Sequence, residues 1–159
     1  LDVKRIHHAV PAVGLNIASC IHGAFSTDEV AAFPGRITMV DGALRHHETP
    51  AFGTSKHLAT LLLAVHSQDE SKVAALNIRP PLRENGVDMD KIKQACEQLG
   101  YTFGLAPKGI VSGKNEKHDV LLDEGAFGWE PSLYILAHNP LELVDRTHQI
   151  VGVRGGASA

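Results

Sequence analysis

The sequence predicts one α/β domain in which helices cover a mixed β-sheet. Four segments have helix signals and six short apolar runs have strand signals, but helices and strands alternate only in part. Strict alternation would favour a parallel sheet, whereas the close succession of strands within residues 36–52 and 118–136 allows hairpins. A length of 159 residues suits a single domain, so we expect one domain over residues 1–159, with a core over about 10–151 and a flexible tail over 152–159.

Each expected helix combines a start signal with apolar residues at helical spacing. The four helices are expected at residues 26–32, 55–66, 89–99 and 139–151. The first opens with Ser26 and Glu29 in the spacing of a capping box and ends before Pro34. The last opens with Asn139 and Pro140. Its expected inner face consists of Leu141, Val144, His148 and Val151.

The two middle helices have the most regular patterns. Residues 55–66 follow the capping candidates Thr54 and Ser55, and their expected inner face consists of Leu58, Leu61, Leu62 and Val65. Residues 89–99 follow Asp88 as cap and end at Gly100, with Cys96 in the core. The strands are expected at residues 17–21, 36–40, 73–78, 101–105, 118–122 and 132–136, and residues 107–117 are expected to form a mobile surface loop.

Composition and motifs exclude several classes of protein. A net charge of −3 gives no basic face for direct nucleic-acid binding, and no apolar run is long enough to span a membrane. The two cysteines are far apart, so we expect a reducing, cytoplasmic location without a disulfide framework. The ten histidines form no H-E-x-x-H motif, and the glycines form no phosphate or dinucleotide loop. The chain begins with leucine, so we expect it to be part of a longer protein.

Residues 52–57, FGTSKH, are the first candidate for a binding site. Gly53 allows close approach of a ligand to the backbone, Thr54 and Ser55 offer hydroxyls, and Lys56 and His57 offer cationic donors at the positive end of a helix. This combination suits a phosphate group. The same residues are also compatible with ordinary helix capping and a solvated lysine.

Two further segments place polar residues next to strands. In residues 75–81, an apolar strand ends in Asn77 and Arg79 just before two prolines, where these residues either line a site or, for Arg79, form a surface ion pair. Residues 123–131, DEGAFGWEP, combine glycines, aromatic rings and carboxylates, so this loop either holds an aromatic ligand and a cation, or covers the core with Phe127 and Trp129. Arg36 adds one cation at the start of a strand.

Five segments resemble, in order, the successive motifs of the ThiN domain. They are VPAVGLNIA at 10–18, DEVAAFPGRI at 28–37, FGTSKHLATLLLA at 52–64, VAALNIR at 73–79 and HDVLLDEGAFGWEP at 118–131. The resemblance covers about residues 10–150. It implies a three-layer α/β/α fold with a mixed, mainly antiparallel sheet, similar to the class II aldolase-like fold of AraD and of the C-terminal domain of hydroxymethylpyrimidine phosphate kinase.

The resemblance also implies a function. Catalytic relatives join hydroxymethylpyrimidine diphosphate to a thiazole phosphate, giving thiamine phosphate and diphosphate, whereas other relatives are non-catalytic thiamine-phosphate-sensing domains of transcriptional regulators. It implies Mg²⁺ without an organic cofactor, with Asp123, Glu124 and Glu130 as candidate ligands. It further implies a kinase or helix-turn-helix domain fused upstream, and a homodimer.

The residues that match the family's motifs define the expected site. Arg36 and His57 match the arginine and the histidine that the family associates with catalysis. The residues expected to bind the substrates and their phosphates are Asn16, Gly53, Thr54, Ser55, Lys56, Asn77, Arg79, Asp123, Gly125, Phe127, Gly128 and Glu130.

Overall fold

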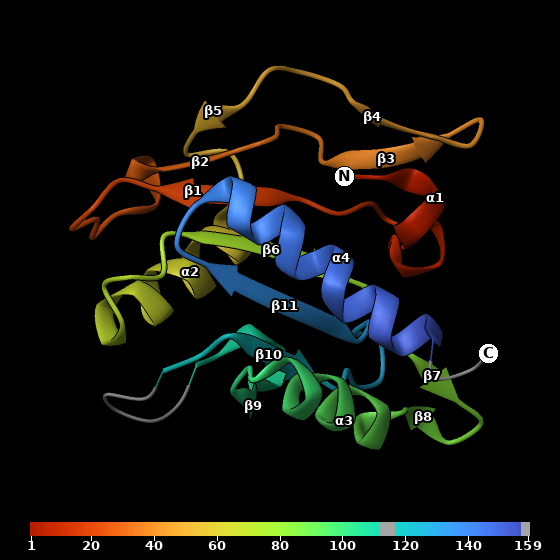
Figure 1. The fold of residues 1–159 in the computed structure, drawn as a ribbon. Helices are drawn as coiled ribbons and strands as arrows, with labels where there is room; N and C mark the ends of the chain where they lie inside the picture. The colour runs from red at the N-terminus through yellow and green to blue at the C-terminus, as the bar shows by residue number, and fades with distance from the viewer. Residues whose placement is uncertain (112–116, 157–159) are drawn as a thin grey trace.

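A computed structural model describes residues 1–111 and 117–156, of which 154–156 are described by their backbone alone. A seven-stranded sheet with the order β5-β2-β1-β6-β11-β10-β9 forms its centre (Figure 1). Its strands are β1 (Ile17–Cys20), β2 (Val30–Ala32), β5 (Ala51–Phe52), β6 (Ala74–Ile78), β9 (Phe103–Leu105), β10 (Val120–Asp123) and β11 (Ser132–Ala137). Neighbouring strands are antiparallel except β9 and β10, so the expected mixed, mainly antiparallel sheet is confirmed.

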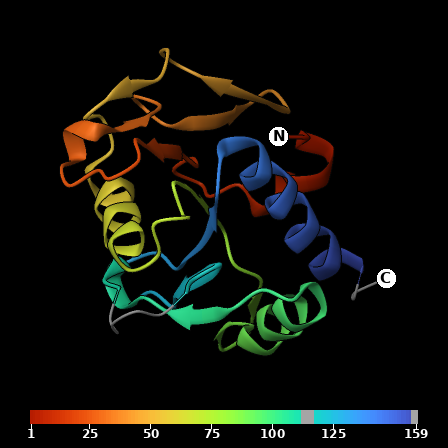
Figure 2. The ribbon, with the colours of Figure 1, turned by 60° about the vertical axis from the view of Figure 1, so that its left-hand side comes forward.

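Helices cover both faces of this sheet. The helix α2 (Lys56–Gln68) packs on one face, and α4 (Pro140–Gly156) packs on the other beside α3 (Met89–Leu99) and the short α1 (Val3–Ile6). Figure 2 shows the three layers with the sheet between α2 and α4. The expected α/β/α arrangement is therefore present.

The two-residue repeat of the strands decides which side chains meet which helix layer. In β11, Leu133 and Ile135 join the core cluster under α4, whereas Tyr134 and Leu136 join the cluster under α2. In β6, Leu76 belongs to the first cluster. The alternation thus places residue 77, next along β6, on the same face of the sheet as α2.

The expected helices 55–66 and 89–99 are confirmed as α2 and α3. Asp88 caps α3 by accepting a hydrogen bond from the backbone N–H of Lys91, and Gly100 ends it with a φ of 75°. Such left-handed backbone is the usual reason for a glycine after a helix. Cys96 is buried, as expected.

The inner face expected for α4 is confirmed at Val151 but wrong at its other three positions. Leu141 is 81% exposed, and the buried residues of this helix are Leu143, Thr147, Ile150 and Val151. The polar Thr147 hid this pattern, but its hydroxyl donates to the backbone carbonyl of Leu143 and is thereby satisfied inside the helix. The helix also continues to Gly156 rather than ending at residue 151, and residues 157–159 of the expected tail lie outside the described residues.

The capping box at residues 26–29 is confirmed, but the helix expected after it is wrong. Ser26 and Glu29 make both capping hydrogen bonds around a short 3₁₀ turn, Thr27–Glu29. The chain then enters β2, whose backbone pairs with β1 and β5. Pairing on both edges satisfies more backbone groups than a single helical turn before Pro34 would.

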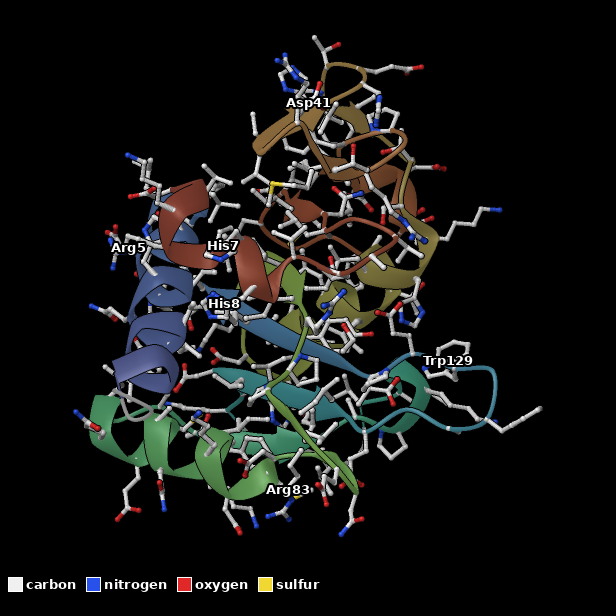
Figure 3. All side chains as sticks on the ribbon, turned by 90° about the vertical axis from the view of Figure 1, so that its right-hand side faces the viewer. Arg5, His7, His8, Asp41, Arg83 and Trp129 are labelled. Atoms are coloured by element: carbon white, nitrogen blue, oxygen red, sulfur yellow. The ribbon has the colours of Figure 1, made fainter. Side chains whose placement is uncertain are left out.

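All six expected strands are present, and the expected hairpins are confirmed. The strand β3 (Ile37–Val40) pairs with β4 (Ala43–His46) outside the main sheet, and β10 pairs antiparallel with β11. A second small hairpin joins β7 (Leu82–Arg83) and β8 (Gly86–Val87). Asp41 in the first hairpin and Arg83 in the second lie at opposite ends of the molecule (Figure 3). None of the described helices is long and apolar enough to cross a membrane.

Ion pairs gather where β6 and β10 begin. Lys72 is only 3% exposed, and its ammonium lies 3.0 Å from the carboxylate of Asp69 and 3.2 Å from that of Asp119. Arg146 of α4 contacts the same Asp119 carboxylate at 2.8 Å. Burial opposes the ionisation of Asp69, but hydrogen bonds from Ser71 and Lys72 outweigh it and lower the pKa of Asp69 to about 2. This end of the sheet is therefore held together by ionised carboxylates.

Candidate functional site

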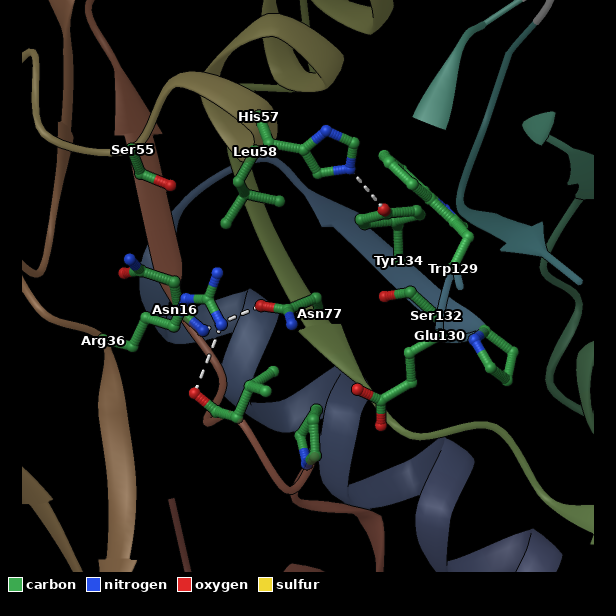
Figure 4. A pocket seen from close by; sticks show the side chains of 13 residues that line it. Asn16, Arg36, Ser55, His57, Leu58, Asn77, Trp129, Glu130, Ser132 and Tyr134 are labelled. Carbon is green, nitrogen blue, oxygen red and sulfur yellow. Dashed lines mark hydrogen bonds between the residues drawn. The ribbon is translucent and has the colours of Figure 1, made fainter. Parts of the chain in front are cut away.

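A cavity of about 370 Å³ opens at the N-terminal end of α2, on the α2 face of the sheet (Figure 4). Its walls come from the segment that precedes β1, the turn before β3, the strands β6 and β11, the first turn of α2 and the loop after β10. It is lined by Pro11, Val13, Asn16, Arg36, Ser55, His57, Leu58, Asn77, Trp129, Glu130, Pro131, Ser132 and Tyr134. Six of the residues expected from sequence are in this list, including both candidate catalytic residues.

A smaller cavity of about 280 Å³ adjoins the first. It is lined by Asn16, Phe33, Gly35, Arg36, Thr54, Ser55, Lys56 and His57. Arg36 and His57 line both cavities although they come from different segments of the chain. The structure thus brings the two expected catalytic residues to one site, together with the hydroxyls and the lysine of residues 54–56.

Arg36 occupies an unusual backbone conformation. Its φ is +67°, next to Gly35 with a φ of +74°. A residue with a Cβ in the left-handed region costs about 1–2 kcal/mol relative to the right-handed one. Among the residues that the structure describes, the guanidinium donates one hydrogen bond, a long one of 3.3 Å to the carbonyl of Val13. The strained backbone therefore turns a lightly held cation toward both cavities.

Asn16 fastens the segment that leads to Arg36. Its amide oxygen accepts hydrogen bonds from the backbone N–H groups of Ile17 and Phe33, and its amide nitrogen donates to the carbonyl of Phe33. Because these bonds occupy most of the amide, the contribution of Asn16 to the site is chiefly to hold residue 33 against β1. The expectation that Asn16 binds a ligand directly remains a prediction.

Asn77 presents a donor to the cavity. Its amide oxygen accepts a 2.7 Å hydrogen bond from the backbone N–H of Asn16, which fixes the orientation of the amide. Within the described part of the chain, its amide nitrogen donates to no other group. The two N–H groups of this nitrogen are thus available to an oxygen or ring nitrogen of a ligand.

The first turn of α2 offers a second set of donors. Ser55 is the N-cap, but among the described residues its side chain makes no capping hydrogen bond. The first backbone N–H groups of a helix have no partner inside the helix and carry its positive end, so they bind anions well. Thr54 is different, because its hydroxyl donates to the carbonyls of Ala32 and Ala51 and thereby fixes the turn before α2.

His57 is held between two aromatic residues and a glycine. Its Nε2 lies 2.9 Å from the hydroxyl of Tyr134, and its ring meets that of Trp129 edge to face at a centroid distance of 5.6 Å. A Cβ placed on Gly109 would lie 2.5 Å from Cε1 of His57. The 3₁₀ turn Pro107–Gly109 therefore packs closely against the imidazole. Residues 112–116 of the mobile loop expected at 107–117 lie outside the described residues.

Tyr134 is the main site residue that the sequence did not indicate. It is 3% exposed, and burial raises the pKa of its hydroxyl, with Ser132 as a hydrogen-bonding neighbour that opposes this rise. Ser132 and Tyr134 lie two residues apart on β11, so both face the α2 side, where they line the cavity. The available signal was that Ser132 and Tyr134 stand at alternate positions of the expected strand and therefore share one face. A tyrosine in an apolar strand, however, normally packs in the core.

The loop after β10 contributes Trp129 and Glu130 rather than the acidic residue at its start. Asp123 is 2% exposed, and its carboxylate accepts hydrogen bonds from Nε1 of Trp129 at 2.6 Å and from the backbone N–H of Gly125 at 2.9 Å. A Cβ on Gly125 would lie 2.6 Å from the carbonyl oxygen of Trp129. Asp123 and Gly125 therefore shape the loop, and the expectation that they contact the ligand finds no support in the lining of the cavity.

Four other expected residues also lie outside both cavities. Phe127 is fully exposed at the tip of the loop, beside Gly128 in the turn, so it covers neither the core nor the site. Gly53 donates its N–H to the carbonyl of Val30 and supports the turn before α2. Arg79 follows β6, beyond the rim that Asn77 lines.

The described residues do not form a cation site. They contain no group of three or more histidine, cysteine, aspartate or glutamate side chains that converge as metal ligands. Of the described carboxylates, Glu130 alone lines either of the two cavities. Glu124 is exposed, and the carboxylate of Asp123 accepts a hydrogen bond from Trp129 of its own loop. His7 and His8, which are adjacent in the sequence, lie beside α4 and away from Trp129 (Figure 3). Side chains here do not fit a Mg²⁺ ion held by protein alone, for which several oxygen ligands are needed.

The sequence of this chain matches a family of known proteins. The family model described as Thiamine-phosphate synthase ThiN matches residues 2–149. The chain belongs to this family. It is also 24% identical to the Thiamine-phosphate synthase ThiN of Methanothermobacter thermautotrophicus over 162 residues, which cover 89% of this chain and 81% of the relative.

Two solved structures have the same fold. The C-terminal domain of a phosphomethylpyrimidine kinase superposes with a TM-score of 0.76 at 20% identity, covering 90% of this chain and 88% of that domain. The C-terminal domain of protein MJ0236 superposes with a TM-score of 0.76 at 21% identity, covering 97% of this chain and 93% of that domain. The family and the α/β fold expected from the sequence motifs are thereby confirmed.

Proposed function

We propose that this member of the ThiN family is a thiamine-phosphate synthase that joins hydroxymethylpyrimidine diphosphate to a thiazole phosphate. The observation that carries the proposal is the shared lining of two adjoining cavities by Arg36 and His57. In the reaction the thiazole nitrogen forms a bond to the pyrimidine methylene carbon, and the bond from that carbon to the diphosphate oxygen breaks. The site must therefore stabilise a departing anion.

The smaller cavity suits this anion. Arg36 and Lys56 supply two permanent positive charges, and the first turn of α2 supplies backbone N–H groups. Removing one such donor from an anion-stabilising site typically lowers turnover by about 10²–10³-fold. Stabilisation of the leaving group is thus the largest contribution that these residues can make to the rate.

The larger cavity suits the two rings. Trp129, Tyr134 and Leu58 give it apolar walls, while the amide nitrogen of Asn77 and the carboxylate of Glu130 give it a donor and an acceptor. Ligand sites of small molecules commonly combine apolar walls with a few polar groups that fix orientation. Mg²⁺, if it takes part, would enter with the diphosphate, because the side chains alone offer it too few oxygens.

A second candidate function is the binding of thiamine phosphate without its synthesis. One observation favours it: among the described residues, Arg36 and Lys56 are the only permanent cations that line either cavity, and Glu130 opposes them. Two cations match the charge of a single phosphate group better than that of a diphosphate. The alternative therefore predicts tight binding of thiamine phosphate and no turnover.

One experiment separates the two functions. The purified protein is incubated with both substrates and Mg²⁺, and thiamine phosphate is measured by mass spectrometry, with Arg36→Ala as the inactive control. Product formed by the wild type and not by the variant supports the synthase. Absence of product, with calorimetric binding of thiamine phosphate that Arg36→Ala weakens, would replace the synthase by the binding function.

A further inference from the structure

His57 does not present a free nitrogen to the cavity in this structure. Nε2 is engaged by the Tyr134 hydroxyl at 2.9 Å, and the other ring nitrogen lies on the side of the ring away from Tyr134 and Asn77 (Figure 4). The ring lies close against Gly109, since a Cβ built on this glycine would meet Cε1 and Nε2 at 2.5 and 2.8 Å. A ligand in the cavity therefore meets the edge of the imidazole rather than a nitrogen.

The Tyr134 hydroxyl is better placed to meet a ligand. It lies between Nε2 of His57 and the Ser132 side chain, and all three residues line the larger cavity. Burial raises its pKa, so it keeps its proton and remains a donor at neutral pH. Tyr134 also belongs to the rigid core under α2, so the hydroxyl has a fixed position.

We propose that Tyr134 donates the proton to the departing diphosphate oxygen and that His57 acts through Tyr134 as its proton source. This inference rests on the proposed synthase function. When His57 is neutral, the hydroxyl of Tyr134 donates to Nε2. When His57 is a cation, Nε2–H donates to the tyrosine oxygen, and the phenolic proton is free to point at the ligand.

The proton balance of the step is complete. As the bond between methylene carbon and oxygen breaks, the phenolic proton moves to the departing oxygen, and the Nε2 proton of His57 moves to the tyrosine oxygen. The histidine is left neutral with its proton on Nδ1. Water that enters after product release returns a proton by the same route. Proton transfer by a positioned side chain typically contributes about 10²–10⁴-fold to the rate.

The charged groups around His57 do not replace this route. Those that line the two cavities or adjoin the packed elements are Arg36, Lys56, Glu130, Lys108 beside Gly109, and Asp123 behind Trp129. None of these five residues forms a hydrogen bond with the His57 ring, whereas Tyr134 does. The tyrosine is thus the direct partner of His57 among the described residues.

A double-mutant cycle tests the relay. The variants are Tyr134→Phe, His57→Gln and the combination, with Tyr101→Phe as the control, because this second tyrosine bonds Gln149 and stacks on Arg146 at the α4 side. Tyr134→Phe is expected to lower kcat by about 10²-fold with a change in KM of less than about threefold. The combination is expected to be no slower than His57→Gln alone within about twofold, because the two residues act as a unit. Tyr101→Phe is expected to match the wild type.

The outcomes separate the relay from the function on which it rests. A wild type that makes no thiamine phosphate refutes both proposals. An active wild type with multiplicative effects in the cycle, or with unchanged kcat in Tyr134→Phe, refutes the relay alone. A second readout needs no turnover: ¹⁵N NMR of neutral His57 is expected to show the Nδ1–H tautomer in the wild type and a mixture in Tyr134→Phe, and identical spectra would refute the relay.

Discussion

The left-handed backbone of Arg36 allows its role in the site to be separated from its role in the fold. Replacement by alanine removes the guanidinium but keeps a Cβ at a φ of +67°. Replacement by glycine removes the guanidinium and the strain together. The two variants therefore lose the same functional group and differ in stability, so each serves as the control for the other.

The expected difference in stability between the two variants follows from the backbone conformation of Arg36. Relief of the left-handed strain stabilises the glycine variant relative to the alanine variant by about 1–2 kcal/mol. The greater freedom of glycine in the unfolded chain destabilises it by about 0.5–1 kcal/mol. Both variants lose the 3.3 Å hydrogen bond from Arg36 to the carbonyl of Val13 equally. Arg36→Gly is thus expected to be more stable than Arg36→Ala by about 0.5–1 kcal/mol, which corresponds to roughly 1–4 °C in Tm for a domain of this size.

The assays are thermal unfolding and steady-state synthesis of thiamine phosphate. Both variants are expected to lose about 10²–10³-fold in kcat/KM because the same anion-stabilising donor is gone. Arg36→Lys is expected to recover part of this loss, since it keeps the charge without the forked geometry of a guanidinium. Wild-type turnover in the glycine variant would remove Arg36 from the site. A glycine variant less stable than the alanine variant by about 0.5–1 kcal/mol would show that the left-handed backbone stores no strain.

Three further predictions concern the surroundings of the site and the far end of the sheet. Gly109→Ala is expected to displace the His57 ring and lower kcat by about 10–100-fold, checked by kinetics and by the crystal structure of the variant. Phe127→Ser is expected to leave kcat unchanged and to shift the free energy of unfolding by no more than about 0.5 kcal/mol, because the side chain is fully exposed. The pKa of Asp69 is about 2, below its ordinary value, so its ion pair with Lys72 is expected to stabilise the fold fully above about pH 4 and to fail as the pH falls toward 2. Urea unfolding of the wild type and Asp69→Asn should then converge at low pH.

Helices long enough to repeat their apolar residues over several turns could be predicted from the sequence, whereas the shortest strands could not. Residues 56–68 and 89–99 repeat their apolar residues over three turns, so packing and local preference agree. The strands β2, β5, β7 and β8 have only two or three residues each, too few to show alternation. At residues 30–32, pairing with two neighbouring strands outweighed a capping box that local rules assign to a helix.

Site residues could be predicted from the sequence where their side chains are polar and have no role in the core. Arg36, Lys56 and Asn77 are polar groups next to strand or helix ends, and each lines a cavity. Tyr134 was not predictable, because a tyrosine within an apolar strand has the same pattern whether its hydroxyl meets a ligand or the core. Asp123 shows the converse: its carboxylate suits a cation, but the indole N–H of Trp129 binds it instead.

The small number of cations and the proposed proton relay are connected. A diphosphate that departs without a proton requires more positive charge than Arg36 and Lys56 provide in the described cavities. A proton delivered through Tyr134 lowers the charge on the departing oxygen, so that two fixed cations and the N–H groups of α2 become sufficient. Such a proton helps only while the bond to carbon is breaking, whereas bound thiamine phosphate gains nothing from it. Loss of the Tyr134 hydroxyl should therefore slow synthesis but leave the affinity for thiamine phosphate nearly unchanged, because catalysis depends on interactions that strengthen in the transition state.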